Sequence, residues 1–231
     1  MMETVIRKLR LVSIVAILLA TLGGLLTVDA TAAVKPQRSF FGSVEVRSSN
    51  LAPFKKWRAA LARYSNELKH INRNTCQSPR LKICNYGQWA TFLKSLKGLD
   101  KFTQIRAVNA RMNKAEYITD KTNWGQNDYW ATPGEFMARF GDCEDFAIVK
   151  YLSLRLLGFP ENELRVVAVK DLNLKIGHAV LIVMLKDPKT GVVKDYVLDN
   201  QIKQVVEAKT IRHYEPVFSI NRNFWWRHRR G

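Results

Sequence analysis

The sequence predicts an α+β domain in which N-terminal helices pack on an antiparallel β-sheet. Between residues 50 and 158, apolar side chains recur every three or four positions, the spacing of amphipathic helices. From residue 164 onwards the spacing becomes that of strands, and a turn-rich segment separates the last two apolar runs. Helices followed by an antiparallel meander are typical of an α+β domain. With 231 residues and 47% hydrophobic residues, the chain is long enough to form one domain with a core.

Residues 1–32 have the order of a secretory signal peptide. A basic start, MMETVIRKLR, precedes an apolar run from Leu11 to Val28, and Ala30 and Ala32 supply a small-residue cleavage site. An uncleaved membrane anchor is the alternative, because a run of this length is near the lower limit for a spanning helix. We favour cleavage after Ala32, which predicts an exported protein.

Residues 33–49 show no clear period, so we expect a flexible N-terminal arm before a single domain over residues 50–231. Asn50 as a cap and Pro53 in the first turn begin the first predicted helix. Its apolar face is formed by Phe54, Trp57, Leu61, Tyr64 and Leu68. Two more helices are predicted around residues 86–96 and 101–114.

Two capping signals predict the next pair of helices. Thr132 and Glu135 form a capping box at the start of a short helix. Asp142 then caps a long apolar helix that begins at Cys143 and ends at Gly158. Cys143 is therefore predicted to lie in the first turn of a buried helix.

Three strands are predicted beyond these helices, over residues 164–170, 179–185 and 195–198. The turn DPKTG joins the last two strands as a hairpin. A loop centred between Pro188 and Lys189 pairs position 178 with position 199, so His178 and Asp199 should meet. The same register takes Asp195 away from this histidine.

The chain has four histidines, and only His178 opens a predicted strand. His70 falls at the end of a helix, where capping is the simpler role. His213 and His228 lie in the basic C-terminal region, without a nearby acid in the sequence. His178 is therefore the candidate base, and Asp199 is the group that orients it.

The net charge is +17, from 37 lysines and arginines against 20 aspartates and glutamates. Such a balance favours anionic partners, but the basic residues are scattered and no nucleic-acid-binding motif accompanies them. We interpret the charge as solvated surface, with a role in docking to anionic lipid or an acidic partner, and we expect no nucleic acid as ligand.

Three cysteines leave one thiol without a partner in an exported protein. Cys76 and Cys84 flank a short loop and can pair as a local disulfide, which leaves Cys143 free. A helix start lowers the pKa of a thiol, whereas nearby carboxylates raise it. Three unrelated residues are the alternative to a Cys143–His178–Asp199 triad, but the helix start and the hairpin register both favour the triad.

The segments DYWATPGEFMARFGDCEDFAIVKY, LRVV, GHAVLIV and YVLDN resemble the bacterial transglutaminase-like cysteine proteinases of the LapG type. The resemblance covers about Trp124 to Asn200 and implies a papain/transglutaminase-like fold. It implies that Cys143 is the nucleophile, His178 the base and Asp199 the orienting acid. The hairpin LKDPKTGVVKD is longer than is usual in this family, which keeps Asp195 as an alternative acid.

The resemblance also implies a biological setting. Members of this family are periplasmic endoproteases that clip a large cell-surface adhesin near its N-terminus at a di-alanine site, which disperses biofilm. An inner-membrane cyclic-di-GMP receptor of the LapD type sequesters the protease when the nucleotide is abundant. We therefore expect these two partners and a periplasmic location.

Three carboxylates surround the candidate nucleophile, in the side chains of Asp142, Glu144 and Asp145. Carboxylate oxygens are the ligands that Ca2+ prefers, and the resemblance implies calcium dependence. A bound Ca2+ would neutralise the charge that disfavours the thiolate. The alternative is that these residues only complement the start of a helix.

Two other function classes stay open from the sequence. One is a non-enzymatic periplasmic binding or scaffold protein that uses the basic surface and the aromatic residues near the C-terminus. The other is a transglutaminase or amidase with the same triad, because acyl transfer begins in the same way whether water or an amine accepts the acyl group.

Overall fold

The computed structural model describes residues 40–71 and 83–230, all of which lie in the compact unit Pro36–Gly231. The predicted signal peptide lies outside these residues. Cys76 also does, so the predicted pairing with Cys84 is not described. Within the described ranges, no helix is both long and apolar enough to cross a lipid bilayer.

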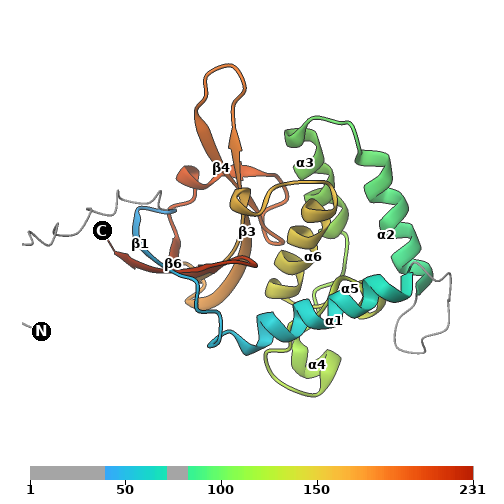
Figure 1. Ribbon diagram of the computed structural model, residues 1–231. Helices are drawn as coiled ribbons and strands as arrows, with labels where there is room; N and C mark the ends of the chain where they lie inside the picture. Colours follow the sequence, from blue (N-terminus) through green and yellow to red (C-terminus); the bar gives the residue numbers. More distant parts are fainter. Residues whose placement is uncertain (1–39, 72–82, 231) are drawn as a thin grey trace, which may run out of the picture. The chain divides into compact units, whose positions relative to one another are not determined.

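Six α-helices lie among the described residues between positions 55 and 156 (Figure 1). They are α1 (Lys55–Ile71), α2 (Ile83–Leu96), α3 (Lys101–Met112), α4 (Asp120–Trp124), α5 (Pro133–Arg139) and α6 (Cys143–Leu156). Five of these helices were predicted, whereas α4 was not. The capping box at Thr132 is present, since its side chain accepts the backbone N–H of Glu135 and the Glu135 side chain accepts the N–H of Thr132.

Seven strands form one sheet in the order β1-β7-β6-β2-β3-β4-β5. Their bounds are Ser43–Ser48 (β1), Leu164–Asp171 (β2), Ile176–Lys186 (β3), Val193–Leu198 (β4), Val206–Glu207 (β5), Tyr214–Ile220 (β6) and Trp225–Arg230 (β7). Every neighbouring pair is antiparallel. Helices on an antiparallel sheet are the predicted fold class, which the structure confirms.

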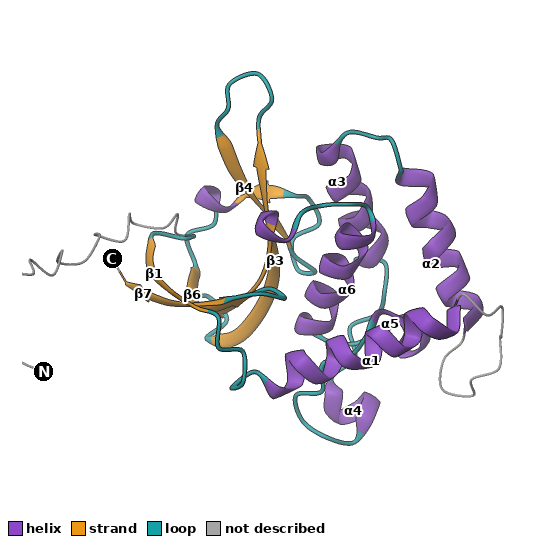
Figure 2. Ribbon diagram, in the orientation of Figure 1, coloured by secondary structure: helices purple, strands orange, loops and turns teal. Residues whose placement is uncertain are grey.

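The sheet is buried on both faces. The helices cover one face, where α6 packs against β2 and β3, and the sheet curves around a smaller core on the other (Figure 2). Alternate residues of β3 serve the two cores: Leu181 and Val183 face the helices, and Val180 and Ile182 face the smaller core. Burial on both faces explains why β3 reads as a continuous apolar run.

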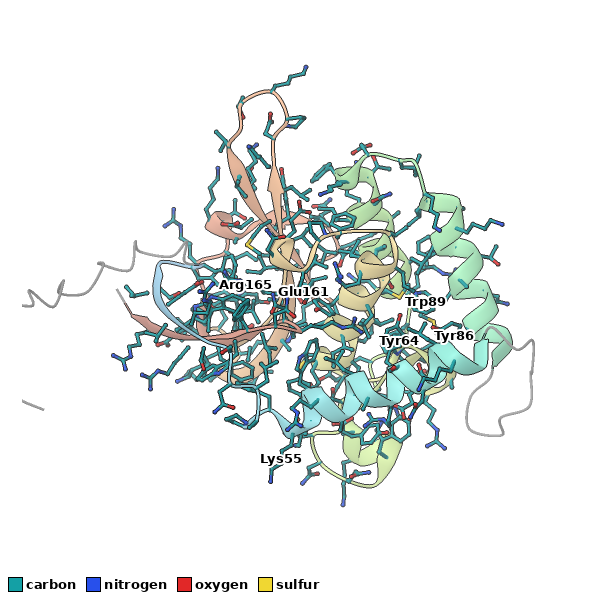
Figure 3. All side chains as sticks on the ribbon, in the orientation of Figure 1. Lys55, Tyr64, Tyr86, Trp89, Glu161 and Arg165 are labelled. Atoms are coloured by element: carbon teal, nitrogen blue, oxygen red, sulfur yellow. The ribbon has the colours of Figure 1, made fainter. Side chains whose placement is uncertain are left out.

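Aromatic residues join the helical layer to α6. Tyr64 of α1 and Tyr86 and Trp89 of α2 lie close together where these helices meet (Figure 3). The rings of Tyr86 and Trp89 are 4.7 Å apart between centroids, and Nε1 of Trp89 donates a 2.9 Å hydrogen bond to Oγ of Ser153. The aromatic cluster therefore holds α2 against the helix that carries Cys143.

The flexible arm predicted over residues 33–49 is wrong for Ser43–Ser48, which form edge strand β1 paired with β7. The strand escaped prediction because its pattern is inverted: Ser43 and Glu45 are buried, whereas Val44 is exposed. Ser43 Oγ lies 2.7 Å from Nδ1 of His228, and Glu45 accepts a 2.9 Å hydrogen bond from Arg165. Specific polar partners, not apolar burial, hold this strand.

Candidate active site

Cys143 is the first residue of α6. Its thiol is partly buried. Burial raises the pKa of this thiol, and the backbone N–H of Ala179, the residue after His178 on β3, acts on it in the opposite direction. Because α6 packs against β3, the fold brings the predicted nucleophile beside the strand that carries the predicted base.

His178 and Asp199 form a buried pair, with Nε2 of the histidine 2.9 Å from Oδ1 of the aspartate. Two further donors hold the same carboxylate: the Gln201 N–H at 2.8 Å from Oδ1 and the Tyr214 hydroxyl at 2.7 Å from Oδ2. Burial alone would raise the pKa of Asp199, but His178 and these hydrogen bonds outweigh burial and lower it. The carboxylate is thus held as an anion.

Tyr214 is a site residue that the sequence did not predict. It comes from β6, and its ring packs against the imidazole of His178 with a centroid separation of 5.7 Å. No local motif marks it, because its role depends on how β6 pairs with β2.

The predicted hairpin register is wrong by two residues. Met184 lies opposite Asp195, and Leu181 lies opposite Leu198. His178 and Asp199 still meet because they lie on the same face of the sheet and a diagonal neighbour remains within reach. Asp195 instead lies where its charge acts on Glu45 and Arg165, so the alternative acid is not beside His178.

The acidic residues around Cys143 gather into a cluster that includes Asp120, which the sequence did not predict. Carboxylate oxygens of Asp120, Asp142 and Asp145 lie within 4.8 Å of one another, and Glu144 groups similarly with Asp142 and Cys143. Asp120 is the first residue of α4, and its N–H donates to Oδ2 of Asp142 at 3.4 Å. The Thr119–Asp120 start of a short helix is a local signal that could have revealed α4, but not the contact of Asp120 with Asp142.

The chemistry of this cluster fits a hard cation. Burial, followed by neighbouring negative charge, raises the pKa of Asp120 to about 6 and that of Glu144 to about 8. Burial also raises the pKa values of Asp142 and Asp145. Among the described residues, the buried Oδ1 atoms of Asp120 and Asp142 have no hydrogen-bond donor. Converging carboxylate oxygens without donors are what a calcium ion would satisfy.

The same charges act on the thiol. Burial raises the pKa of Cys143, and the carboxylates of Glu144 and Asp142 raise it further. Sγ donates a 3.2 Å hydrogen bond to Oε2 of Glu144. The negative charges of Glu144 and Asp142 therefore favour the protonated thiol of Cys143 over the reactive thiolate.

Gly141 is required by the close approach of Asp145. A Cβ at position 141 would overlap Oδ2 of Asp145. The other carboxylate oxygen of Asp145, Oδ1, accepts a 2.6 Å hydrogen bond from the backbone N–H of Ala131. The glycine of the GDCED segment therefore leaves room for a carboxylate of the acidic cluster.

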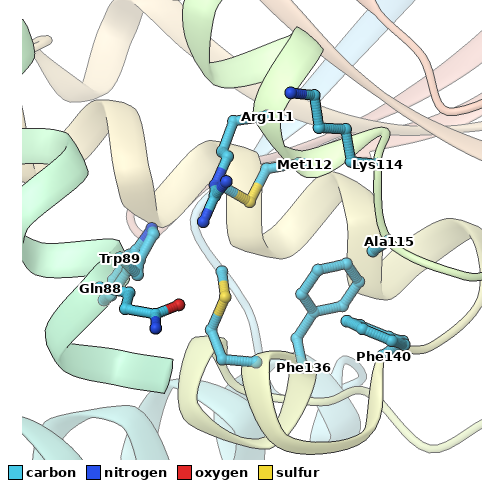
Figure 4. A pocket seen from close by; sticks show the side chains of 9 residues that line it. Gln88, Trp89, Arg111, Met112, Lys114, Ala115, Phe136 and Phe140 are labelled. Carbon is cyan, nitrogen blue, oxygen red and sulfur yellow. The ribbon is translucent and has the colours of Figure 1, made fainter. Parts of the chain in front are cut away.

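A cavity of about 300 Å3 lies between α2, α3 and α5 (Figure 4). Its lining includes Trp89, Met112 and Phe136, together with the exposed cations Arg111 and Lys114. Cys143, His178 and Asp199 are not among its lining residues. This cavity is distinct from the candidate active site.

Comparison with known proteins places the chain in a family. Residues 73–226 match the family model described as bacterial transglutaminase-like cysteine proteinase. Among curated proteins, none matches.

Solved structures of Legionella pneumophila LapG are similar to this chain. One is 32% identical, with a TM-score of 0.55, over 62% of this chain and 77% of that chain. A calcium-bound form is 28% identical, with a TM-score of 0.57, over 71% of this chain and 87% of that chain. An EGTA-treated form is 33% identical, with a TM-score of 0.52, over 59% of this chain and 72% of that chain. The chain therefore belongs to the bacterial transglutaminase-like cysteine proteinases and is a cysteine protease with a transglutaminase-like α+β fold.

Proposed function

We propose that Cys143, His178 and Asp199 are the catalytic triad of a calcium-dependent periplasmic endopeptidase. Its substrate is a large cell-surface adhesin, cut at a di-alanine site in its N-terminal region, which releases the adhesin and disperses biofilm. The observation that carries the proposal is that the helix that begins at Cys143 packs against the strand that carries His178 of the buried His178–Asp199 pair. This helix is α6, and His178 Nε2 is 2.9 Å from Oδ1 of Asp199.

The two nitrogens of His178 have different tasks in this mechanism. Nε2 donates to Asp199, which leaves Nδ1 as the acceptor for the proton of Cys143. The thiolate attacks the carbonyl carbon of the scissile bond, and N–H groups at the start of α6 stabilise the oxyanion. The imidazolium then protonates the leaving amine. Water, with His178 as base, hydrolyses the thioester and restores the thiol.

The cluster of Asp120, Asp142, Glu144 and Asp145 holds calcium in this proposal. The calcium-bound and EGTA-treated forms of LapG support it, as do the donor-free oxygens of the cluster. When bound, Ca2+ neutralises the carboxylates and removes their contribution to the raised pKa of Cys143.

The adhesin, the periplasmic location and inhibition by a LapD-type cyclic-di-GMP receptor rest on the resemblance of the GDCEDFA segment and its neighbours to the family. The predicted signal peptide supports export. The 28–33% identity to LapG supports the same substrate class.

The experiment is cleavage of a purified N-terminal adhesin fragment from the same genome by the mature chain that begins at residue 33. Each reaction is run in excess calcium, in EGTA, and in EGTA followed by calcium. Cys143→Ala is the inactive control, and a fragment with its di-alanine changed to two arginines is the substrate control. Dansylcadaverine in a parallel reaction reports transfer to an amine.

We expect two product fragments from the wild type in calcium, none in EGTA, and recovery when calcium returns. Cleavage that persists in EGTA would contradict the calcium site but not the protease. Incorporation of the amine without cleavage would favour a transglutaminase. If neither reaction occurs in excess calcium and Cys143→Ala still binds the fragment, the protein is a scaffold.

A further inference from the structure

The edge strand β1 exposes apolar side chains between arginines of its neighbour β7. Val44 and Val46 of β1 are 52% and 49% exposed. Their partners in the register are Arg229 and Arg227 of β7, which are also exposed. Directly opposed residues of an antiparallel pair share a face of the sheet, so the two valines and the two arginines form one surface. We call these four residues the basic apolar face.

The basic apolar face continues the side of the sheet that the helices cover. Phe218 of β6 lies opposite Arg227, and its ring packs on Phe54, the residue before α1, with centroids 5.1 Å apart. Beyond this contact, β1 and β7 form the end of the sheet that lies away from the helices (Figure 2). The opposite face of the same two strands is buried, at Glu45 and His228. The strands therefore turn polar side chains inwards and valines outwards, which leaves the apolar surface of the valines in water.

The arginines of this face have no acidic partner. Glu45 is the only acidic residue of β1 and β7, and its carboxylate is buried. The neighbouring strand β6 adds one acid, Glu215, which lies opposite Lys170 of β2. Among the described residues, neither Arg227 nor Arg229 forms an ion pair. The face therefore combines unpaired positive charge with exposed apolar surface.

We propose that the basic apolar face docks the protein on a bilayer that contains anionic phospholipid. Guanidinium groups bind phosphate through paired hydrogen bonds, and apolar side chains beside them leave water at the boundary between headgroups and acyl chains. An acidic protein would match the arginines only, because a charged segment offers little apolar surface to the valines. This inference goes beyond the proposed protease activity and does not depend on it.

Docking through this face leaves the candidate active site accessible. In the order of the sheet, β6 and β2 separate β7 from β3, the strand that carries His178. A docked chain therefore binds the bilayer through one end of its sheet and keeps the other end for its substrate.

The test is co-sedimentation of the mature chain, which begins at residue 33, with sucrose-loaded vesicles. One kind of vesicle is phosphatidylcholine alone, and the other is an equimolar mixture of phosphatidylcholine and phosphatidylglycerol. Each is used at low and at high salt, because salt screens attraction to an anionic surface. Soluble poly-glutamate in a parallel titration reports binding to an acidic polypeptide, and light scattering reports self-association.

Three double variants locate the surface that binds. The arginine variant carries Arg227→Gln and Arg229→Gln, the valine variant carries Val44→Thr and Val46→Thr, and the lysine control carries Lys94→Gln and Lys97→Gln. Both lysines of the control are exposed and lie at the C-terminal end of α2, so the control removes the same charge from another part of the surface. The melting temperature of each variant shows whether it is folded.

We expect the wild type to sediment with the anionic vesicles at low salt and to stay in solution with the neutral ones. The arginine variant should bind the anionic vesicles about 10- to 30-fold more weakly, since each arginine at such a surface contributes about fivefold. The valine variant should bind about threefold more weakly, and the lysine control should stay within about twofold of the wild type.

A wild type that does not bind the anionic vesicles would overturn the inference. A lysine control that loses as much affinity as the arginine variant, or a valine variant that binds like the wild type, would also overturn it, because net charge alone would then explain binding. Binding to poly-glutamate without binding to vesicles would assign the face to an acidic protein, and a dimer that the valine variant disrupts would assign it to a second copy of this chain. If the arginine variant does not fold, the valine variant and the lysine control still decide.

Discussion

Replacing Lys150 by methionine should stabilise the fold in a pH-dependent way. Burial lowers the pKa of this lysine from an ordinary 10.5 to about 7. Each pKa unit corresponds to about 1.36 kcal/mol, so the buried charge costs about 5 kcal/mol when the side chain is protonated in both states. Methionine has a similar length and no charge, and it should recover most of this free energy of unfolding.

The sign of the pH dependence follows from proton uptake on unfolding. Below about pH 7 the ammonium is present in the folded and unfolded chains, and the full penalty applies. Between about pH 7 and 10.5 only the unfolded chain holds the proton, so the penalty shrinks as pH rises. At pH 9.5 only about 1 kcal/mol should remain.

Urea unfolding of the wild type and Lys150→Met, followed by tryptophan fluorescence at pH 6 and 9.5, measures this gap. The matched control Lys97→Met should change the free energy of unfolding by less than about 0.5 kcal/mol at both pH values. A gap that is the same at pH 6 and 9.5, or a less stable Lys150→Met, would refute the reasoning. Either result would mean that Nζ is solvated or paired in the folded protein.

Three further predictions concern the candidate site. Asp199→Asn should abolish peptide cleavage, whereas Asp195→Asn should leave kcat/KM within about twofold of the wild type; a larger effect of Asp195→Asn would reopen the choice of acid. Tyr214→Phe keeps the ring on His178 but removes a buried hydrogen bond to a charged group, so kcat should fall by about 10- to 100-fold with little change in KM. Calcium binding should release protons at pH 7 and weaken as pH falls, because the pKa of Glu144 is raised to about 8. Calorimetry in two buffers of different ionisation enthalpy measures this proton release. A binding enthalpy that is the same in both buffers would contradict the prediction.

The helix starts around Cys143 could be predicted from the sequence because their signals are local. Thr132 and Glu135 satisfy each other's backbone groups within one turn, and Asp142 stands directly before the apolar run that begins at Cys143. Neither signal depends on the rest of the fold. The α+β class was also predictable, since each change of period reports a change of element.

The hairpin register was not predictable from the position of its turn residues. β3 continues to Lys186, and the turn closes with a 2.8 Å hydrogen bond from the Asp187 N–H to the carbonyl of Val192, which moves its centre towards the C-terminus. The contact between His178 and Asp199 survived this error because residues two apart share a face of the sheet. A shift of one residue would have separated them.

Asp120 and Tyr214 were missed for a different reason. The segment before α4 reaches the acidic cluster through the Ile118 N–H, which donates to the carbonyl of Gly141 at 2.9 Å. Tyr214 reaches Asp199 through the pairing of β6 with β2. Both residues join the site only through contacts between distant parts of the chain, and no pattern in a single segment encodes such contacts.

The pairing of β1 with β7 joins the two ends of the domain in one sheet. A polypeptide emerges from the ribosome N-terminus first, so Ser43–Ser48 must wait for Trp225–Arg230 before they find their native partner. β6, which carries Tyr214, likewise gains its second neighbour only when β7 arrives. The protease therefore cannot complete its sheet before β7 has been synthesised, and a chain that lacks β7 lacks the finished support of its candidate active site.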